Sequence, residues 1–453
     1  MTLRPSTSAW LAGGPASPGE PLEGTERADV AIVGGGFTGL WSAIHLKDAD
    51  PAAEVVVVER EVVGFGASGR NGGFAMTMVG RSLHDLLRKV GPGRARATYD
   101  AMLRTLAGIE SFCAAEGIDA DLTRPGVLTV SNGPEQDVRV ARDVEAAERL
   151  GLEGFRWLDR RACQALVASP VVRCGHLEDA ALLLDPDALV RGLREAAVRR
   201  GVRVYERTPV LDLAPRARGV ELRTPRGGVR AERALVATGA YARATPPVRR
   251  FLFAVYAYIA LTEPLSPEQW SRIGWERRMG IEDKRVMPHF HRPTPDGRIL
   301  WGGRDAPYAP RVPDPRREAD PRPLARLEET FRWTFPQLAD VRIERGWTGP
   351  IDATVRAMPT VRWVRGERVL CALGYSAHGV APSCLVGEVV RDLLLGRRSE
   401  LLELPFTSLR PVPLPPEPLR GALIGGAQRL LLRADDRGGR GALARPLLRV
   451  LRG

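Results

Sequence analysis

The apolar residues between positions 28 and 58 form a strand, a helix and a second strand in quick succession. Ala28 to Val33 is an apolar run of the length of a buried strand. Leu40 to Lys47 has helical spacing of its apolar residues, and Pro51 ends this helix. Val55 to Val58 is again continuously apolar. Continuous apolar strands on either side of a helix predict a parallel sheet with both faces covered.

Elements of the same kind return in two later parts of the chain. Their pattern predicts a helix at 186–200, a strand at 202–206, a hairpin from 220–224 and 228–230, and buried strands at 234–237 and 369–373. The segment from Gly374 to Leu395 is expected to begin as a glycine-containing loop and to continue as a helix. The intervening segments have a different pattern of apolar residues, with an aromatic, β-rich stretch around 251–262 and a further strand at 298–302. Two interleaved domains therefore account for the pattern.

We predict an α/β fold with a Rossmann-like, nucleotide-binding domain built on the βαβ unit. An α+β second domain with an antiparallel sheet is interleaved with it and holds the substrate. The expected boundaries are an N-terminal extension at 1–27, a discontinuous nucleotide-binding domain at 28–90, 175–245 and 345–408, a substrate domain at 91–174 and 246–344, and a basic C-terminal tail at 409–453.

Three glycines at dinucleotide-binding spacing lie between the first strand and the first helix. Gly34 allows a tight turn, Gly36 lets the backbone approach a pyrophosphate, and Gly39 lets the helix pack closely on the strand. The pyrophosphate then lies at the helix N-terminus, where free N–H groups and the helix dipole favour negative charge. The context of strand, glycine turn and helix indicates a dinucleotide site.

An acidic residue and a second glycine-rich loop narrow the choice of dinucleotide. Glu59 ends the second strand, where a carboxylate accepts hydrogen bonds from ribose hydroxyls and repels a 2′-phosphate. The loop from Gly64 to Gly73 offers backbone N–H groups to a long cofactor, and Ser68 and Asn71 add side-chain donors and acceptors. Glu59 therefore argues against NADP, and the loop favours FAD over NAD.

The chain resembles the D-amino-acid-oxidase-like superfamily of FAD oxidoreductases, and within it the glycine/sarcosine oxidase and gamma-glutamylputrescine oxidoreductase branch. The resemblance spans residues 28 to 405 in the order of the family. Its pieces are GGGFTGL at 34–40, Glu59-Arg60, GASGRNGG at 66–73, ATGAYA at 237–242, PDGRILWGG at 295–303 and GYSAHGVAPSCLVG at 374–387.

The motifs and the resemblance together imply an FAD site. The resemblance places Val210 at the adenine, Thr238 and Gly239 at the diphosphate, and the 374–380 loop at the flavin ring. The expected cofactor-binding residues are Gly34, Gly36, Phe37, Thr38, Gly39, Glu59, Arg60, Ala67, Ser68, Arg70, Asn71, Gly72, Gly73, Val210, Thr238, Gly239, Gly374, Tyr375, Ser376, His378, Gly379 and Val380. Because the 66–73 loop has neither Cys nor His, we expect noncovalent FAD.

The catalytic candidates lie in the second domain and in the flavin loop. His289 and His291 share one face of the predicted strand, and Phe290 and Arg292 share the other, so either face could form the pocket. Arg292 suits a substrate carboxylate, and His378 offers a donor beside the flavin. Sarcosine-oxidase-like members carry a lysine near the flavin loop, whereas Gly379 to Pro382 here has no basic residue. A sarcosine-type anchor is therefore in doubt.

The net charge of +12 changes this picture little. All but three of the 66 basic residues are arginine, and most are interleaved with acids. No nucleic-acid partner is expected. After Pro418 the arginines face few acids, and we expect a solvated tail or a weak peripheral membrane contact. Five scattered cysteines and no metal-ligand spacing favour a cytoplasmic protein without a metal site.

The expected activity is oxidation of the C–N bond of an amine or N-substituted amino acid. The carbon beside nitrogen delivers a hydride to flavin N5, the imine hydrolyses, and O2 reoxidises the flavin to give H2O2. An alternative is a dehydrogenase that passes electrons to a quinone or a carrier protein at the membrane. A third reading is an RNA-modifying flavoprotein, which the dispersed arginines disfavour.

Overall fold

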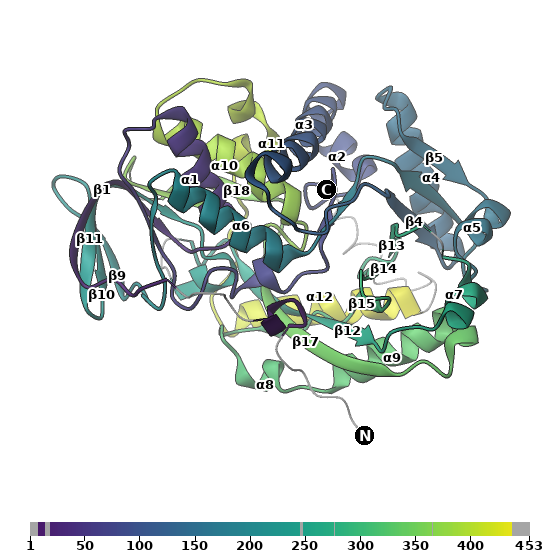
Figure 1. Ribbon diagram of the computed structural model, residues 1–453. Helices are drawn as coiled ribbons and strands as arrows, with labels where there is room; N and C mark the ends of the chain where they lie inside the picture. The colour runs from purple at the N-terminus through teal and green to yellow at the C-terminus, as the bar shows by residue number, and fades with distance from the viewer. Residues whose placement is uncertain (1–7, 14–18, 245–247, 276, 365, 437–453) are drawn as a thin grey trace.

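Two large sheets organise the protein. The computed structural model describes residues 8–13, 19–244, 248–275, 277–364 and 366–436. In Figure 1 the first sheet lies on the left of the view, and the second lies on the right and along the bottom. The mixed α/β fold with a parallel and a largely antiparallel sheet confirms the predicted fold class.

The first sheet has a core of five parallel strands in the order β19-β11-β1-β2-β8 among the described residues. Beyond them, β18 pairs antiparallel with β19, while β10 and β9 extend from β11 as antiparallel strands. Its strands are β1 (Gly24–Val33), β2 (Val55–Val58), β8 (Arg203–Tyr205), β9 (Asp212–Pro215), β10 (Val220–Thr224), β11 (Gly227–Val236), β18 (Thr360–Trp363) and β19 (Val369–Leu373).

Helices cover one face of this sheet, and the β9–β10–β11 ribbon covers the other. Ile32 and Val57 point into the core beneath the helices, whereas Ala31 and Val56 point into the core beneath the ribbon. Both faces are therefore apolar, which explains the continuous apolar runs in the sequence. The covering helices are α1 (Phe37–Ala49), α3 (Pro92–Glu116), α6 (Pro186–Arg199) and α10 (Val380–Leu394).

The predicted βαβ unit is confirmed, with two differences at its edges. β1 begins at Gly24, ahead of the expected start at Ala28, because Gly24 to Ala28 pair with Gly227 to Ala231 of β11. β11 is one ten-residue strand and not two, since its first half pairs with both β1 and β10. The apolar periodicity of one strand does not reveal which other strands pair with it, so these bounds could not be predicted.

The second sheet follows the order β16-β12-β15-β14-β13-β4-β6-β5, and β17 also pairs with β12. Its pairs are antiparallel except for β13 and β4, which run parallel. The strands are β4 (Val127–Ser131), β5 (Phe155–Leu158), β6 (Cys174–Glu178), β12 (Phe253–Thr262), β13 (Gly280–Asp283), β14 (His289–Pro293), β15 (Ile299–Gly303), β16 (Tyr308–Ala309) and β17 (Ile343–Ala353).

One face of the second sheet packs on helices, and the other turns toward the first domain. Trp301 on β15 packs edge-on against Phe331 and near Phe335, at and just beyond the end of α9. On the opposite face, Phe290 contacts Phe74 with ring centroids 5.7 Å apart. Phe74 belongs to β3 (Phe74–Ala75), which pairs with β7 (Leu182–Leu183).

The remaining helices surround these layers. They are α2 (Leu83–Val90), α4 (Pro134–Arg149), α5 (Arg160–Leu166), α7 (Pro267–Ile273), α8 (Pro315–Glu318), α9 (Arg322–Thr334), α11 (Pro405–Ser408) and α12 (Leu419–Asp436), with 3₁₀ turns at Trp10–Gly13, Ala67–Gly69, Gly239–Ala244, Pro336–Leu338 and Glu400–Glu403.

Three segments lie in a different domain from the one that the sequence predicted. β6 lies in the second sheet, although 175–245 was assigned to the first domain. β17 pairs along its length with β12, although 345–408 was assigned to the first domain. The expected extension at 1–27 is not separate, because Leu22 is buried in the first domain's core. Pairing across the sheet decides membership, and local pattern does not reveal it.

Part of the expected basic tail is folded against the second domain. Helix α12 runs past β12 and β15 in Figure 1. Arg420 is buried and donates to the carbonyl of Arg249 at 2.9 Å. The carboxylate of Asp435 accepts from the N–H groups of Val286 and Met287 at 3.0 Å each. The expectation of a solvated tail is therefore wrong for 419–436, while residues 437–453 lie outside the described ones.

A membrane-spanning helix would need both length and an apolar composition. Within the described ranges, none of the helices meets both requirements.

Asp435→Ala tests the docking of α12. The Asp435 side chain is 2% exposed, so its removal leaves two buried backbone amides without an acceptor. We expect a loss of about 1–3 kcal/mol in the free energy of unfolding. A lower thermal midpoint measures it. Arg433→Ala on the exposed side of the same helix is the control. Equal midpoints for both variants would contradict the docking.

Candidate cofactor and substrate site

The expected cofactor residues gather at the carboxyl-terminal edge of the first sheet. Gly34 follows β1, Glu59 follows β2, Thr238 follows β11 and Gly374 follows β19. Because these strands are parallel and adjacent, their carboxyl ends meet at one edge. In open α/β sheets, ligands bind beyond this edge. Residues far apart in the chain are thus brought together as the motifs indicated.

The glycine turn leaves no room for side chains. Gly34 has a φ of +113°, and a Cβ there would lie 2.5 Å from the carbonyl oxygen of Ala237. A Cβ on Gly39 would lie 2.0 Å from the carbonyl oxygen of Gly34. A Cβ on Gly36 would lie 2.8 Å from the hydroxyl of Ser68. The absence of side chains at these three glycines therefore allows the close backbone contacts that their spacing predicted.

Glu59 is held in place by backbone N–H groups. Its two carboxylate oxygens accept from Gly35 at 2.8 Å and from Glu61 at 3.0 Å. Burial is the main cause that raises the pKa of Glu59, while these two bonds oppose the rise. Each carboxylate oxygen has a second lone pair. Glu59 can thus also accept from ribose hydroxyls.

The second glycine-rich loop folds onto the start of α1 and onto the N-terminal segment. Ser68 accepts from the N–H of Phe37 at 3.0 Å, which places its hydroxyl at the helix N-terminus. The Asn71 side chain accepts from Gly73 at 2.8 Å and fixes the loop internally. The Trp10 indole donates to the carbonyl of Asn71 at 2.9 Å. The chain before β1 therefore supports the cofactor loop, a role that composition alone did not suggest.

The late loop brings a second helix N-terminus to the same edge. Ser376 and Ala377 have positive φ values of 54° and 73°, and the loop leads into α10 at Val380. Tyr375 and Thr38 share a hydrogen bond of 2.7 Å between their hydroxyls, so the starts of α10 and α1 are tied together. His378 is half-buried, with Nδ1 3.1 Å from the carbonyl oxygen of Ser376.

These residues fit FAD as a cofactor. The N-cap of α1, Gly36, has no side chain that could fill the helix end, so N–H groups remain for a pyrophosphate. Gly239 has a φ of +51° and open space where a Cβ would lie. The N-terminus of α10 lies at the other end of the edge and suits negative charge on a flavin ring. Glu59, α1 and α10 would then hold ribose, diphosphate and ring.

The thiols near the flavin loop are inert side chains of the core. Cys371 on β19 is buried, and burial raises its pKa to about 12. Cys384 on α10 is also buried, and burial raises its pKa well above the usual value. Neither is poised as a thiolate. This supports the expected noncovalent attachment, which stays a prediction.

Three potential metal ligands meet between α1 and α10. His45, Cys384 and Glu388 offer ligand atoms within 4.8 Å of one another. Burial and the positive charge of Arg391 lower the pKa of His45 to about 4. The same guanidinium acts on Glu388. We assign no ion here, because this positive charge disfavours a cation.

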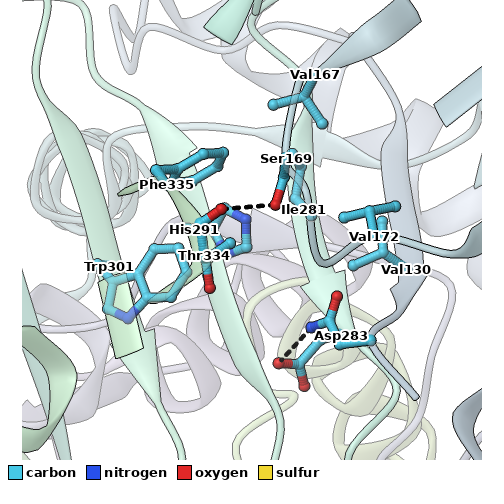
Figure 2. A pocket seen from close by; sticks show the side chains of 11 residues that line it. Val130, Val167, Ser169, Val172, Ile281, Asp283, His291, Trp301, Thr334 and Phe335 are labelled. Carbon is cyan, nitrogen blue, oxygen red and sulfur yellow. Dashed lines mark hydrogen bonds between the residues drawn. The ribbon is translucent and has the colours of Figure 1, made fainter. Parts of the chain in front are cut away.

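His289 and His291 point away from the cofactor edge. His291 stacks on Trp301 with ring centroids 4.2 Å apart and lies near Phe335, as Figure 2 shows. The cavity beside it encloses about 10 Å³, room for at most one water molecule. Burial lowers the pKa of His291 to about 3. This face is core, which argues against the catalytic role expected for either histidine.

His289 is held in place by the neighbouring carboxylate of Asp283. Asp283 accepts from the backbone N–H of His289 and lies 3.1 Å from its Nδ1. Arg285 lies beside the same carboxylate, and these partners hold the pKa of Asp283 at about 2, against the effect of burial. The strand alternation was predicted correctly, and the structure selects which face meets the first domain.

Arg292 lies on the side of the cofactor but is already engaged. Its Nη1 donates to the carbonyl of Leu184 at 2.8 Å and lies 3.4 Å from that of Gly73. Its Nη2 makes no hydrogen bond among the described residues and is 3.7 Å from the carboxylate of Asp121. The side chain is fully buried, and burial lowers its pKa to about 10. Arg292 thus joins the two domains, which argues against its expected role as a substrate clamp.

Glu282 is a residue of this face that sequence reasoning missed. It is paired with Phe290 across β13 and β14 and with Thr129 across β13 and β4. The ring of Phe290 packs over Gly72 of the cofactor loop, and a Cβ on Gly72 would lie 2.7 Å from this ring. Glu282 therefore shares the face that meets the first domain. Two adjacent acids, Glu282 and Asp283, in a buried four-residue strand were the available signal.

The family comparison matches most of the chain. A model of the DAO family, described as FAD dependent oxidoreductase, matches residues 29–393. Gamma-glutamylputrescine oxidoreductase of Escherichia coli (strain K12) is 32% identical over 383 residues, which are 84% of this chain and 86% of that protein. Glycine oxidase of Bacillus licheniformis is 25% identical over 386 residues, 82% of this chain and 94% of that protein.

Solved structures share the fold. Glycine oxidase from Geobacillus kaustophilus has a TM-score of 0.72 at 21% identity and covers 85% of this chain and 100% of its own. L-amino acid deaminase from Proteus vulgaris has a TM-score of 0.70 at 19% identity and covers 87% of this chain and 100% of its own. At these identities the likeness concerns the fold alone.

Gly36→Ala tests the cofactor cradle. The added Cβ meets only the hydroxyl of Ser68, which can rotate away, so the fold is expected to persist. The methyl group would instead occupy the space that a pyrophosphate needs. We expect at least a tenfold lower FAD affinity, measured by flavin absorbance per protein during titration. Gly108→Ala, at an exposed helical glycine with open space, is the control. Equal FAD affinity in both variants would contradict the assignment.

Proposed function

This chain belongs to the FAD dependent oxidoreductase family, and we propose that it oxidises the carbon–nitrogen bond of an amine or N-substituted amino acid. We propose O2 as the electron acceptor and H2O2 as the product. Matched relatives include gamma-glutamylputrescine oxidoreductase and glycine oxidase, whose names refer to an amine and an amino acid. The observation that carries the proposal is the common edge where Glu59, α1 and α10 meet the face of Glu282 and Phe290.

Bound FAD supplies an acceptor for the hydride that leaves the carbon beside nitrogen. The chain's own part is to position the reactants and to exclude water. Phe74 and Phe290 close the space between the cofactor loop and the second sheet with apolar rings. His378 precedes the N-terminus of α10, where the helix dipole favours negative charge.

The anchoring groups favour an amine over a substrate held by its carboxylate. Gly379 to Pro382 contains no basic residue. The guanidinium of Arg292 is fully buried, its Nη1 donates to the carbonyl of Leu184, and its Nη2 lies 3.7 Å from the carboxylate of Asp121 without a hydrogen bond among the described residues. A substrate carboxylate thus finds neither of the two cations that the sequence and the resemblance suggested. Glu282, which is paired with Phe290 on the face that meets the first domain, instead offers a carboxylate to a cationic nitrogen.

We also propose a cytoplasmic location. All five cysteines are free and buried, which supports a reducing compartment. A peripheral membrane contact finds less support than the sequence suggested, because the part of the tail at 419–436 packs on the second domain.

Anaerobic flavin reduction tests the reaction class. Purified protein with FAD is mixed without oxygen with gamma-glutamylputrescine, putrescine, glycine and N-methylated glycines, and the visible flavin band is followed. We expect at least one amine of this set to bleach the band within seconds to minutes. A flavin that stays oxidised with all of them would contradict the proposed reaction.

Reoxidation in air tests the acceptor. After reduction, admitted O2 should restore the band and yield one H2O2 for each flavin, measured with a peroxidase-coupled dye. A reduced flavin that persists in air but is reoxidised by a soluble quinone would contradict O2 as the acceptor and support a dehydrogenase.

A further inference from the structure

Glu282 is a buried carboxylate without a partner on the face that meets the cofactor domain. Its side chain is 9% exposed, and no described residue gives it a hydrogen bond or an ion pair. The carboxylates around it differ in this respect. Glu178 accepts from the hydroxyl of Thr77, and Asp143 pairs with Lys284. A buried unpaired charge is costly, so it needs a functional explanation.

The position of Glu282 connects it with the predicted flavin loop. Gly280, two residues earlier on the same face, would place a Cβ 2.3 Å from Phe74. Its cross-strand neighbour Phe290 packs over Gly72 of the cofactor loop. Among the neighbouring groups that lower the pKa of Glu282, His378 has the largest effect, although burial raises this pKa more. Glu282 therefore lies on the face of the second sheet that meets the cofactor loop.

The groups that face Glu282 come from four elements. His378 belongs to the late loop, Lys284 and Asp283 to the end of β13, Asp143 to α4, and Glu178 to β6. His378 and Lys284 lower the pKa of Glu282, and the three acids raise it. Burial outweighs both effects and raises the pKa of Glu282. A raised pKa is the property that a carboxylate base needs near neutral pH.

We infer that Glu282 is the catalytic base that takes a proton from the substrate ammonium group before the C–H bond breaks. The inference rests on the proposed amine oxidation. In this step one N–H bond breaks and one O–H bond forms on the carboxylate. The nitrogen keeps the electron pair, and nothing is oxidised or reduced. The released lone pair then assists loss of the hydride from the adjacent carbon.

The chemistry of the amine makes this base useful. An alkylammonium group has a pKa near that of lysine, about 10.4, so about one molecule in a thousand is neutral at pH 7.4. A base in the site lets the abundant cation bind and react. The same negative charge selects cationic amines over substrates that present a carboxylate. Glu282 would thus determine both proton transfer and specificity.

Glu282→Gln tests the inference through the pH profile of anaerobic flavin reduction. The probe is the amine from the set above that reduces the wild-type flavin fastest. In the wild type, the apparent second-order rate constant should level off once the carboxylate is ionised. In E282Q only the neutral amine reacts, so the constant should rise tenfold per pH unit up to the pKa of the amine. We expect a loss of about 100-fold or more at pH 7 that shrinks at high pH.

Two further variants separate a base from a structural charge. Glu282→Asp keeps a carboxylate and should keep the plateau. Glu178→Gln makes the same change two strands away on the same face and should keep the wild-type profile. FAD content and the flavin spectrum confirm folding in each case. A flat profile in E282Q, or the same tenfold slope in E178Q, would overturn the inference. Absence of reduction in the wild type would instead count against the proposed reaction.

Discussion

The close approach of β1 and β11 at their carboxyl ends is the constraint on which the site depends. There the backbone of Gly34 lies against the carbonyl of Ala237, and the backbone of Gly39 lies against that of Gly34. Any side chain at these positions would separate the strand from α1. The approach fixes the start of α1, where the N–H of Phe37 donates to Ser68 of the second loop and Thr38 shares a hydrogen bond with Tyr375 of the late loop. One turn thus sets the geometry of three loops.

The second sheet acts through the difference between its two faces. The face of His291 and Trp301 is an aromatic core beneath α9, whereas the face of Phe290 and Glu282 meets the cofactor loop. Arg292 holds this orientation, because it donates across the domain boundary to Leu184 and Gly73. Burying a guanidinium is costly, and the backbone carbonyls offset part of that cost.

Local pattern predicted much of this fold, since the strands β1 and β2 and the helix between them have clear periodicity. It also predicted that His289 and His291 share one face. It did not predict which face meets the other domain, because that depends on pairing between segments far apart in the chain. The role of Arg292 could not be predicted either, because its hydrogen-bond partners are backbone carbonyls, which every residue has. Glu282 was missed because an acid in a strand has meaning only once its neighbours are known.

A crystal structure of the protein with bound FAD tests the central claim most directly. The account predicts the adenine-side ribose at Glu59, the diphosphate at the start of α1 and the flavin ring between α10 and the face of Phe290 and Glu282, with no bond to any side chain. A flavin ring on the side of His291 and Trp301, or a ribose away from Glu59, would contradict it.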